Sequence, residues 1–473
     1  MTDRGPPAVA PPAPSGSGLR ALLPRRDELS ELLRLALPVS AVQVGMMLMG
    51  VVDTVMVGHV SPADLAGVAL GNIYFFGSCV FGMGLLFSLD PVVSQAVGAG
   101  DRVAMARGVQ RGLVMAVFLS VAACLLLTAA GPVLSLLRQP PEVVPKAAAY
   151  AVATIPGVLP FYLFLVLRQT LQAQGTVLPI VAAMVVANVA NVGFNWVLVY
   201  GNLGMPALGA EGSGWASSLS RLVLAVGVLA ISWRLLRDLV RPFRRASFRW
   251  PPIRRMLGLG APIGAQMAME YGAFGAAGIF MGILGTVAVA GHQIALNLSA
   301  LTFMVPLGIS QATAVLVGRG VGAEDPPRAR RAAVGGLVVG AGFMTGTMVL
   351  FLLLPETLAR IYSGDVAVVG LAASLLPIAG LFQVFDGIQV VATGVLRGVG
   401  DTRVPMFLNL LGFWVLGIPL GLGLAFGLDL GPRGLWWGLA AGLMAVAALL
   451  LLRVRRRLAG ALLRLQLDED HEE

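Results

Sequence analysis

Charged residues are scarce in this sequence. Asp, Glu, Lys and Arg make up only 12% of the 473 residues, whereas hydrophobic residues make up 57%. A soluble domain carries about 25% charged residues. A chain this long and this apolar cannot hide its hydrophobic surface in one aqueous core, so it needs a lipid bilayer as its solvent. The low charge therefore excludes an ordinary soluble protein.

Cysteine and histidine are nearly absent. The two cysteines, Cys79 and Cys124, lie in apolar stretches without metal-ligand spacing, which indicates small buried side chains. The three histidines are His59, His292 and His471, and none forms a recognisable pattern with a Ser or Cys that it could activate as a nucleophile. A Walker A sequence is also lacking, so ATP-driven pumping by this chain is not expected. We expect neither an enzyme nor a protein with a resident cofactor.

Residues 1–32 lack the apolar core of a cleavable signal peptide. They are rich in Pro and Arg, and the first apolar run starts only at Leu33. The first apolar helix must therefore direct insertion itself. We expect residues 1–32 to form a disordered cytoplasmic tail. Residues 458–473 are expected to form an acidic tail whose final DEDHEE is disordered as well.

Long hydrophobic runs fill the rest of the chain. A transmembrane helix needs about 20 predominantly apolar residues. Twelve such runs occur, near residues 33–57, 66–97, 109–130, 147–173, 177–200, 214–236, 256–282, 288–317, 332–354, 367–396, 404–427 and 434–452. Proline interrupts many of them, which transport helices tolerate because neighbours or water satisfy the freed carbonyl groups. The sequence predicts an all-α polytopic membrane protein with twelve transmembrane helices.

Positive charge is distributed unevenly between the two sides of the membrane that these runs would cross. With the N-terminus in the cytoplasm, 28 of the 33 Lys and Arg residues fall in cytoplasmic segments or helix ends. Only Arg138, Lys146, Arg360 and Arg433 fall on the other side. Because cytoplasmic loops are enriched in Lys and Arg, this bias predicts that both termini are cytoplasmic. It also accounts for the net charge of +9 without nucleic acid as a partner.

The basic segment 237–255 divides the chain nearly in half. It is the longest basic run and contains three prolines, so we expect a cytoplasmic linker there. The linker would join an N-terminal lobe, residues 33–236, to a C-terminal lobe, residues 256–457. Each lobe would then hold six helices.

The two halves resemble each other at an offset of 224 residues. Pro38 then falls on Pro262, and the GAGD of 98–101 falls on the GAED of 322–325. With an even number of helices in each half, the repeat is parallel, about an axis along the membrane normal. Such repeats place a substrate path at their interface, near the bilayer midplane.

Three carboxylates lie deep inside apolar runs: Asp53 in GVVDTVMVG, Glu270 in QMAMEYGAFG and Asp386 in FQVFDGIQVV. A charge at the bilayer centre costs from about 2.5 to over 10 kcal/mol, so it is rare without a use. A buried carboxylate can take a proton, hold a cation such as Na⁺ or pair with a cationic guest. These occupancies exclude one another, and that exclusion is what coupled transport requires. The other interpretation is a carboxyl group fixed by a hydrogen bond for packing alone.

Amide side chains gather in the fifth predicted helix. Asn191 and Asn195 are four residues apart and share one helix face. Amide oxygens suit a hard cation or a protonated carboxyl group, but amides also join helices by hydrogen bonds, and both interpretations stay open. Other polar residues that could line a cavity are Gln43, Asn188, Gln266, His292, Gln293 and Asn297.

Two further charged residues stand apart. Asp90 precedes Pro91 near a helix end, where we expect it to cap the helix or reach water. Arg221 is the only basic residue that we place within a span.

Eight motifs spread over about residues 30–455 carry a family resemblance. They are VDTVMVG at 52–58, SQAVGAGD at 94–101, NVGFNWVLVYG at 191–201, EGSGWAS at 211–217, ME at 269–270, NLSALTFMVPLGISQA at 297–312, VGRGVGAED at 317–325 and TGVLRGVGDTRVP at 393–405. Together they resemble the multidrug and toxic compound extrusion (MATE) transporters, in particular the NorM-like branch. The resemblance implies two pseudo-symmetric six-helix bundles around a central cleft, working by alternating access. It also implies export of cationic, amphipathic drugs in exchange for H⁺ or Na⁺.

The resemblance also implies site residues. The acidic residue of the first helix in this family matches Asp53, and the Glu and Asp of the NorM-like branch match Glu270 and Asp386. A cation site in the N-terminal lobe would fall on Asp53, Asn191, Asn195 and Ser217, although family members often carry Thr at the last position. Na⁺ would bind either to Asp53, Asn191 and Asn195 or to Glu270 and Asp386.

Two other classes of membrane protein compete with a drug exporter. A lipid-linked oligosaccharide flippase or polysaccharide exporter of related fold handles anionic lipids and would need intramembrane Arg or Lys, of which we place only Arg221. A channel would not saturate or exchange its cargo. We therefore expect a monomeric exporter of small organic cations in a bacterial cytoplasmic (inner) membrane.

Overall fold

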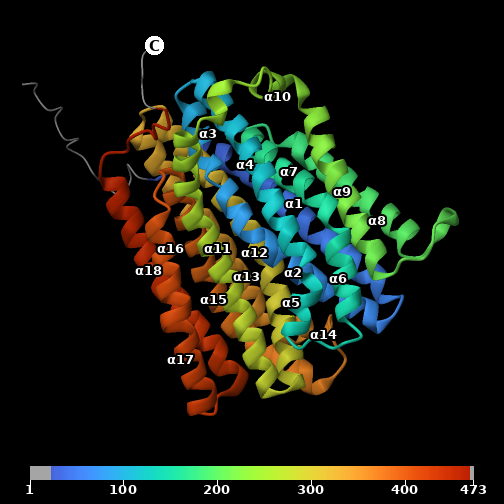
Figure 1. The fold of residues 1–473 in the computed structure, drawn as a ribbon. Coiled ribbons are helices and arrows are strands. Elements are labelled where there is room, and N and C mark those ends of the chain that lie inside the picture. Colours follow the sequence, from blue (N-terminus) through green and yellow to red (C-terminus); the bar gives the residue numbers. More distant parts are fainter. Residues whose placement is uncertain (1–22, 469–473) are drawn as a thin grey trace, which may run out of the picture.

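The computed structural model describes residues 23–468, which form two bundles of helices side by side (Figure 1). Within these residues, twelve helical spans are long and apolar enough to cross a membrane. The predicted all-α fold with twelve spans is therefore confirmed. We call α1 to α9 the N-lobe and α11 to α18 the C-lobe; in Figure 1 the N-lobe runs from blue to green and the C-lobe from yellow-green to red.

The elements follow one another without strands in the described part of the chain. The N-lobe consists of α1 (Arg26–Gly58), α2 (Pro62–Leu86), α3 (Leu89–Gly98), α4 (Arg102–Thr128), α5 (Ala130–Leu136), α6 (Val144–Ala153), α7 (Val158–Ala173), α8 (Leu178–Leu198) and α9 (Ala210–Ile231). The connection carries α10 (Trp233–Val240). The C-lobe consists of α11 (Trp250–Leu284), α12 (Thr286–Gly322), α13 (Pro326–Leu353), α14 (Pro355–Arg360), α15 (Val366–Gly398), α16 (Arg403–Asn409), α17 (Ile418–Leu422) and α18 (Gly431–Ala459), with π-helical turns at Leu410–Gly417 and Gly423–Gly427.

Several helix boundaries differ from the predicted ones. α1 begins at Arg26, so residues 26–32 are helical and not part of a disordered tail. Asp27 and Glu28 in its first turn favour a helix start there, because acidic side chains stabilise the positive end of the helix dipole. α11 begins at Trp250, inside the predicted linker, with prolines in its first turn that need no N–H partner. Residues 1–22 and 469–473 lie outside the described residues.

The lobes are packed together at one end of the bundle. This end, which we call the basic end, is where α1 and α11 begin and α18 finishes, at the top of Figure 1. Glycines allow close approach there: a Cβ atom added to Gly322 of α12 would overlap the backbone of Gln95 on α3. An ion pair of 2.8 Å between Glu28 and Arg331 also joins the lobes at this end.

The lobes separate toward the opposite end. Tyr271 of α11 donates a hydrogen bond of 3.1 Å to the carbonyl oxygen of Ile73 on α2, roughly half-way along the helices. Beyond this contact, no hydrogen bond or ion pair within residues 23–468 joins the two lobes. A Cβ atom on Gly278 or Gly282 of α11 would meet nothing within 4 Å. The structure is thus closed at the basic end and looser at the other.

Residues 460–468, which we call the C-terminal strap, run back across the basic end. Arg464 pairs with Asp101 at 2.7 Å, and Asp468 pairs with Arg111 at 2.6 Å. The backbone N–H of Leu465 donates to the side chain of Gln95 at 2.8 Å. The strap therefore ties the last helix of the C-lobe to the N-lobe. The DEDHEE segment, predicted to be disordered, begins with a residue that is in fact docked.

The two carboxylates that dock the strap, Asp468 in the strap and Asp101 before α4, are held in their charged form. The backbone N–H of Ala104, helped by Arg464, lowers the pKa of Asp101. Burial acts to raise the pKa of Asp468, but Arg111 and Arg107 together lower it. Because these folded-state pKa values lie below the ordinary carboxyl value, the ion pairs are complete at neutral pH. Their stabilisation is lost only as the pH falls through the lowered values.

Removing both carboxylates should release the strap. In the double variant Asp101→Asn and Asp468→Asn, we expect amide hydrogen exchange within residues 460–468 to rise about tenfold, because two partly buried ion pairs are lost. Hydrogen exchange followed by mass spectrometry measures this directly. Glu356→Gln, which removes an exposed carboxylate from α14, is the control and should leave the exchange unchanged. Equal exchange in the double variant and in the unmodified chain would contradict the strap's docking.

Candidate functional site

Asp53 on α1 is the centre of a buried polar cluster in the N-lobe. Its Oδ1 accepts hydrogen bonds from Asn195 at 2.7 Å and from Asn191 at 3.1 Å, both on α8. Its Oδ2 accepts one of 2.5 Å from Ser217 Oγ on α9. Asp53 is only 2% exposed, and the other three side chains are as well buried. Three helices therefore bring together the four residues selected from the sequence; we call them the N-lobe cluster.

Small residues in α9 make this cluster geometrically possible. A Cβ atom on Gly212 would overlap the carbonyl oxygen of Leu198 on α8, and one on Gly214 would crowd the backbone of Tyr150 on α6. Glycines at these positions let the helices approach closely without the side chains that would otherwise separate them. Ser217 lies one turn further along α9 and thereby reaches Asp53.

The amide oxygens of the N-lobe cluster have no partners. Asn191 Oδ1 and Asn195 Oδ1 are buried, and neither accepts a hydrogen bond from any described residue. The nitrogen and oxygen of an amide are placed by hydrogen-bond logic, and exchanging them leaves the heavy atoms in position. In the exchanged orientation, the two amide oxygens, the carboxylate and the Ser217 hydroxyl form a set of oxygen ligands suited to a hard cation. The donor set therefore has the oxygen chemistry that Na⁺ prefers.

Two residues near this cluster carry charge or polarity that sequence reasoning did not assign to it. Arg221, four residues after Ser217 on α9, lies within electrostatic range of Asp53, and its guanidinium stacks 3.8 Å from the centre of the Phe75 ring. Tyr150 interacts with Ser217 from α6. The spacing from Ser217 to Arg221 was a usable signal, because residues four apart share a helix face. Nothing in the sequence places Tyr150 there.

Glu270 is the centre of a second polar cluster, in the C-lobe. Its Oε1 accepts hydrogen bonds from Gln266, one turn earlier on α11, at 3.0 Å and from Gln389 on α15 at 2.9 Å. Asp386 of α15 is near enough for its charge to act on Glu270. Both carboxylates are half-buried, whereas Asp53 is fully buried. We call Glu270, Asp386, Gln266, Gln389 and Asn409 the C-lobe cluster.

Gln389 and Asn409 were missed from the sequence. Gln389 Nε2 donates to Asn409 Oδ1 at 2.9 Å as well as to Glu270, so it links α15, α16 and α11. The signal for Gln389 was its position three residues after Asp386, on the same face of one helix. Asn409 is a single polar residue in an apolar run, so no spacing pattern marked it as a site residue. Its partner could not be known before the helices were packed.

Five of the six proposed cavity residues belong to neither carboxylate cluster; only Gln266 belongs to one of them. Gln43 accepts a hydrogen bond of 2.7 Å from the fully buried Arg168 near the basic end. Asn188 bonds to the carbonyl oxygen of Gly45 on α1 at 3.1 Å. His292 is buried with its ring against Trp436, and Gln293 is exposed. The structure provides no grounds for placing Gln43 or His292 at a cavity wall.

Asn297, the last of these, is half-buried and pairs with Gln293 at 3.4 Å along α12.

Asp90 does not behave as predicted. It neither caps its helix nor reaches water, because it is 4% exposed and pairs with Arg397 of α15 at 3.2 Å. The prediction failed because Arg397 is distant in sequence and belongs to the other lobe. Nor is Arg221 the only basic residue within a span, since the helical spans extend far enough to include Arg111, Arg168 and Arg397. The pair of Asp90 and Arg397 instead adds a buried ionic contact to the lobe interface.

Among residues 23–468, no group of three His, Cys, Asp or Glu side chains is placed to hold a metal ion. The N-lobe cluster supplies one carboxylate and the C-lobe cluster supplies two. These counts suit a monovalent ion or a proton better than a tightly held divalent metal.

The family model described as MatE matches the chain twice, over residues 38–197 and 262–422. This chain belongs to the MatE family. The two matches start 224 residues apart, which is the offset at which the halves resemble each other. Each lobe of this MatE protein therefore carries one copy of the family's repeat. The family consists of transporters and not of enzymes, as the sequence led us to expect.

Curated relatives match almost the whole MatE chain. It is 37% identical over 449 residues to the probable multidrug resistance protein NorM of Mesorhizobium japonicum, covering 91% of this chain and 94% of the relative. It is 37% identical over 456 residues to the multidrug resistance protein PmpM of Pseudomonas aeruginosa, covering 94% of both. The multidrug resistance protein MdtK of Edwardsiella ictaluri is 34% identical over 435 residues, covering 90% and 95%.

Solved structures share the fold of this MatE chain. The eukaryotic MATE transporter AtDTX14 superimposes with a TM-score of 0.83 at 24% identity, covering 91% of this chain and 99% of that one. An outward-facing multidrug resistance MATE family transporter superimposes with a TM-score of 0.81 at 20% identity, covering 94% and 99%. At these identities the likeness establishes the fold alone. Together with the relatives, it makes the chain a multi-pass membrane protein.

Proposed function

We propose that this protein exports small organic cations across a bacterial cytoplasmic membrane in exchange for Na⁺ or H⁺. The observation that carries the proposal is one carboxylate cluster in each lobe of a polytopic transporter fold, fully buried in the N-lobe and half-buried in the C-lobe. A buried carboxylate can hold a proton, an inorganic cation or a cationic guest, but it cannot hold two of them at once. Competition of this kind couples one flux to the other. The relatives named as multidrug resistance proteins agree with such a cargo.

The division of labour between the clusters follows from their burial. The N-lobe cluster, Asp53, Asn191, Asn195 and Ser217, is fully buried, and its oxygen atoms suit the coupling ion. Glu270 and Asp386 in the C-lobe cluster are only half-buried, so a larger organic cation can approach them. Na⁺ at the C-lobe cluster is the alternative placement, because two neighbouring carboxylates also attract a cation.

Orientation and movement complete the proposal. We place the basic end, with both termini, in the cytoplasm, because Lys and Arg concentrate on that side of membrane proteins. The lobes are then joined at the cytoplasmic side and apart at the outer side, which is the outward-facing arrangement. Alternating access requires the two lobes to rock about the clusters. One chain supplies both lobes, so we propose that the protein works as a monomer.

A flippase for anionic lipid-linked sugars fits the geometry less well. Such cargo needs basic side chains that are free to meet a pyrophosphate. Of the basic residues inside the spans, Arg111 pairs with Asp468, Arg397 pairs with Asp90, Arg168 donates to Gln43, and Arg221 stacks on Phe75 close to Asp53. Carboxylates thereby neutralise Arg111 and Arg397, and the contacts of Arg168 and Arg221 hold their guanidinium groups inside the N-lobe.

Reconstituted flux tests the proposal. Purified protein in liposomes is given ethidium and either a Na⁺ gradient or a pH gradient, one at a time. We expect saturable ethidium transport driven by one of the two gradients, with the ion moving in the opposite direction. Flux that persists with the Na⁺ gradient after the pH gradient is collapsed identifies Na⁺, and its loss identifies H⁺. Non-saturating flux that neither gradient drives would refute an antiporter.

Ser217→Ala should weaken binding of the coupling ion. The hydroxyl contacts the Asp53 carboxylate, and a hydrogen bond to a charged group contributes about 1.5–3 kcal/mol. We expect the ion concentration for half-maximal transport to rise about tenfold or more, measured in the same liposomes. Ser218→Ala is the matched control, because the neighbouring hydroxyl bonds to the backbone of Ala153 and not to Asp53. An unchanged ion dependence in Ser217→Ala would remove Ser217 from the ion site.

A further inference from the structure

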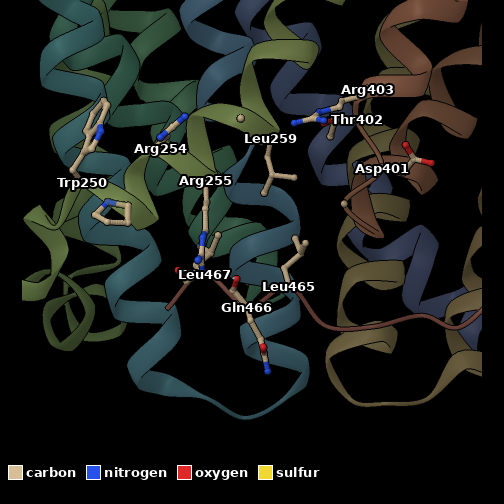
Figure 2. Close-up of a pocket in the computed structure, with 13 residues that line it drawn as sticks. Trp250, Arg254, Arg255, Leu259, Asp401, Thr402, Arg403, Leu465, Gln466 and Leu467 are labelled. Atoms are coloured by element: carbon tan, nitrogen blue, oxygen red, sulfur yellow. Dashed lines mark hydrogen bonds between the residues drawn. The ribbon is translucent and has the colours of Figure 1, made fainter. Parts of the chain in front are cut away.

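A cavity at the basic end is separate from both carboxylate clusters. It has a volume of about 770 Å³ and lies between the first turns of α11 and the turn that leads into α16. The C-terminal strap forms a further wall, through residues 465–467. Figure 2 shows this cavity with Trp250, Arg254 and Arg255 on α11 and Arg403 on the facing turn. Neither transport cluster contributes a residue to it.

The cavity wall carries a net positive charge. Arg254 and Arg403 are exposed, and neither forms an ion pair or side-chain hydrogen bond with a residue in the range 23–468. Arg403 extends toward α11 in Figure 2. The carboxylate on the wall, Asp401, is neutralised by Arg453 at 2.7 Å. Arg255 donates to the carbonyl oxygen of Leu467 at 3.0 Å and so stays at the cavity edge while it holds the strap.

The other walls of the cavity are apolar. Pro251, Leu259, Leu465 and Leu467 line it beside the arginines. Trp250 is 61% exposed, and tryptophans in such positions lie at the boundary between lipid and water. The hydrophobic part of α11 begins directly after Arg255, so the arginines are at headgroup depth. One guanidinium group can donate two parallel hydrogen bonds to two oxygens of a phosphate. Basic pockets at this depth therefore suit the phosphates of lipid headgroups.

We propose that this cavity binds the phosphate of an anionic phospholipid, with Arg254 and Arg403 as the main anion ligands. The apolar walls favour an amphiphile over a soluble phosphate, because glycerol and the first acyl carbons can contact the leucines. The inference goes beyond the proposed transport function and does not rest on it. Because the strap forms one wall, a bound headgroup also stabilises the closed basic end.

Lipid retention by the purified full-length protein tests the site. Protein in detergent is supplied with phosphatidylglycerol or phosphatidylcholine, and retained lipid is counted by native mass spectrometry. We expect preferential retention of one phosphatidylglycerol. The double variant Arg254→Gln and Arg403→Gln should lose at least tenfold in retention, whereas Arg254→Lys and Arg403→Lys should keep most of it. If the double Gln variant aggregates, the two single Gln variants are measured instead, and each should retain clearly less lipid.

The matched control removes the same charge elsewhere on the same side. Arg234 and Arg245 are exposed and lie outside the cavity, so Arg234→Gln with Arg245→Gln should retain lipid normally. An equal loss in this control would mean that the arginines act only as general surface charge, and would overturn the site. Unchanged retention in the cavity variants would overturn it too. Displacement of the lipid by millimolar glycerol phosphate would reassign the cavity to a soluble anion.

Discussion

Glu270→Gln and Asp386→Asn are each expected to abolish drug export while leaving the protein folded and inserted. Both substitutions keep the size of the side chain and remove its charge. Gln at position 270 can still bond to Gln266 and Gln389, so the packing of α11 against α15 persists. Loss of a charge that pairs with a cation in a partly buried site costs about 2–5 kcal/mol, which corresponds to a fall of about 30-fold or more. Ethidium or norfloxacin efflux, normalised to the amount of membrane-inserted protein, measures it.

The control for these variants is a carboxylate of the same type in an exposed position. Glu356 on α14 pairs with Arg360 at 3.4 Å on the surface, where an ion pair contributes little. Glu356→Gln should therefore export drug at the normal rate. Normal export by both Glu270→Gln and Asp386→Asn would refute their role in coupling, whatever the behaviour of the N-lobe cluster.

Gly322→Val is expected to reduce transport to less than about a tenth by preventing closure at the basic end. Even a single Cβ atom at this position overlaps the backbone of Gln95, which cannot move aside as a flexible side chain would. The lobes must then separate at the basic end, and an alternating-access transporter loses one of its two required states. The same overlap explains why a glycine lies at this helix crossing.

Chemical labelling can show the separation. A cysteine placed at Ser94, which is completely buried beside Gly318 of the other lobe, should react with a maleimide several times faster when Gly322→Val is present. Cys79 and Cys124 are first replaced by alanine. Gly342→Val on α13, where a Cβ atom meets nothing within 4 Å, is the control and should change neither labelling nor transport. Unaltered labelling in Gly322→Val would mean that this crossing does not set the closed state.

The candidate carboxylates could be found from the sequence because a charge inside an apolar run carries a large free-energy cost in the bilayer and is rarely kept without a function. Asp53, Glu270 and Asp386 needed no knowledge of neighbours to be selected. Asn191 and Asn195 followed from their four-residue spacing. Gln389, Asn409 and Tyr150 escaped because a single polar residue in a long apolar helix can face lipid, core or site. Only the rotation of each helix against its neighbours distinguishes these positions.

Contacts between distant parts of the chain were likewise beyond the sequence. Asp90 and Arg397 each looked like a residue at the end of a helix. They are 307 positions apart in sequence, and their pairing depends on the contact between the two lobes. The hydrogen bond between Gln43 of α1 and Arg168 of α7 was likewise not apparent from the sequence. The strap looked like a tail because its binding partners, Asp101 and Arg111, lie in another lobe.

The sequence by itself determined that this is a membrane protein, how many times it crosses the bilayer, and that its two halves are related. These properties follow from the length and spacing of apolar runs, which bilayer thickness fixes without reference to any partner. The tertiary structure alone decided which polar groups meet, which end is closed and where a cationic cavity forms. Those depend on helix rotation and close glycine crossings, for which a linear pattern holds no information.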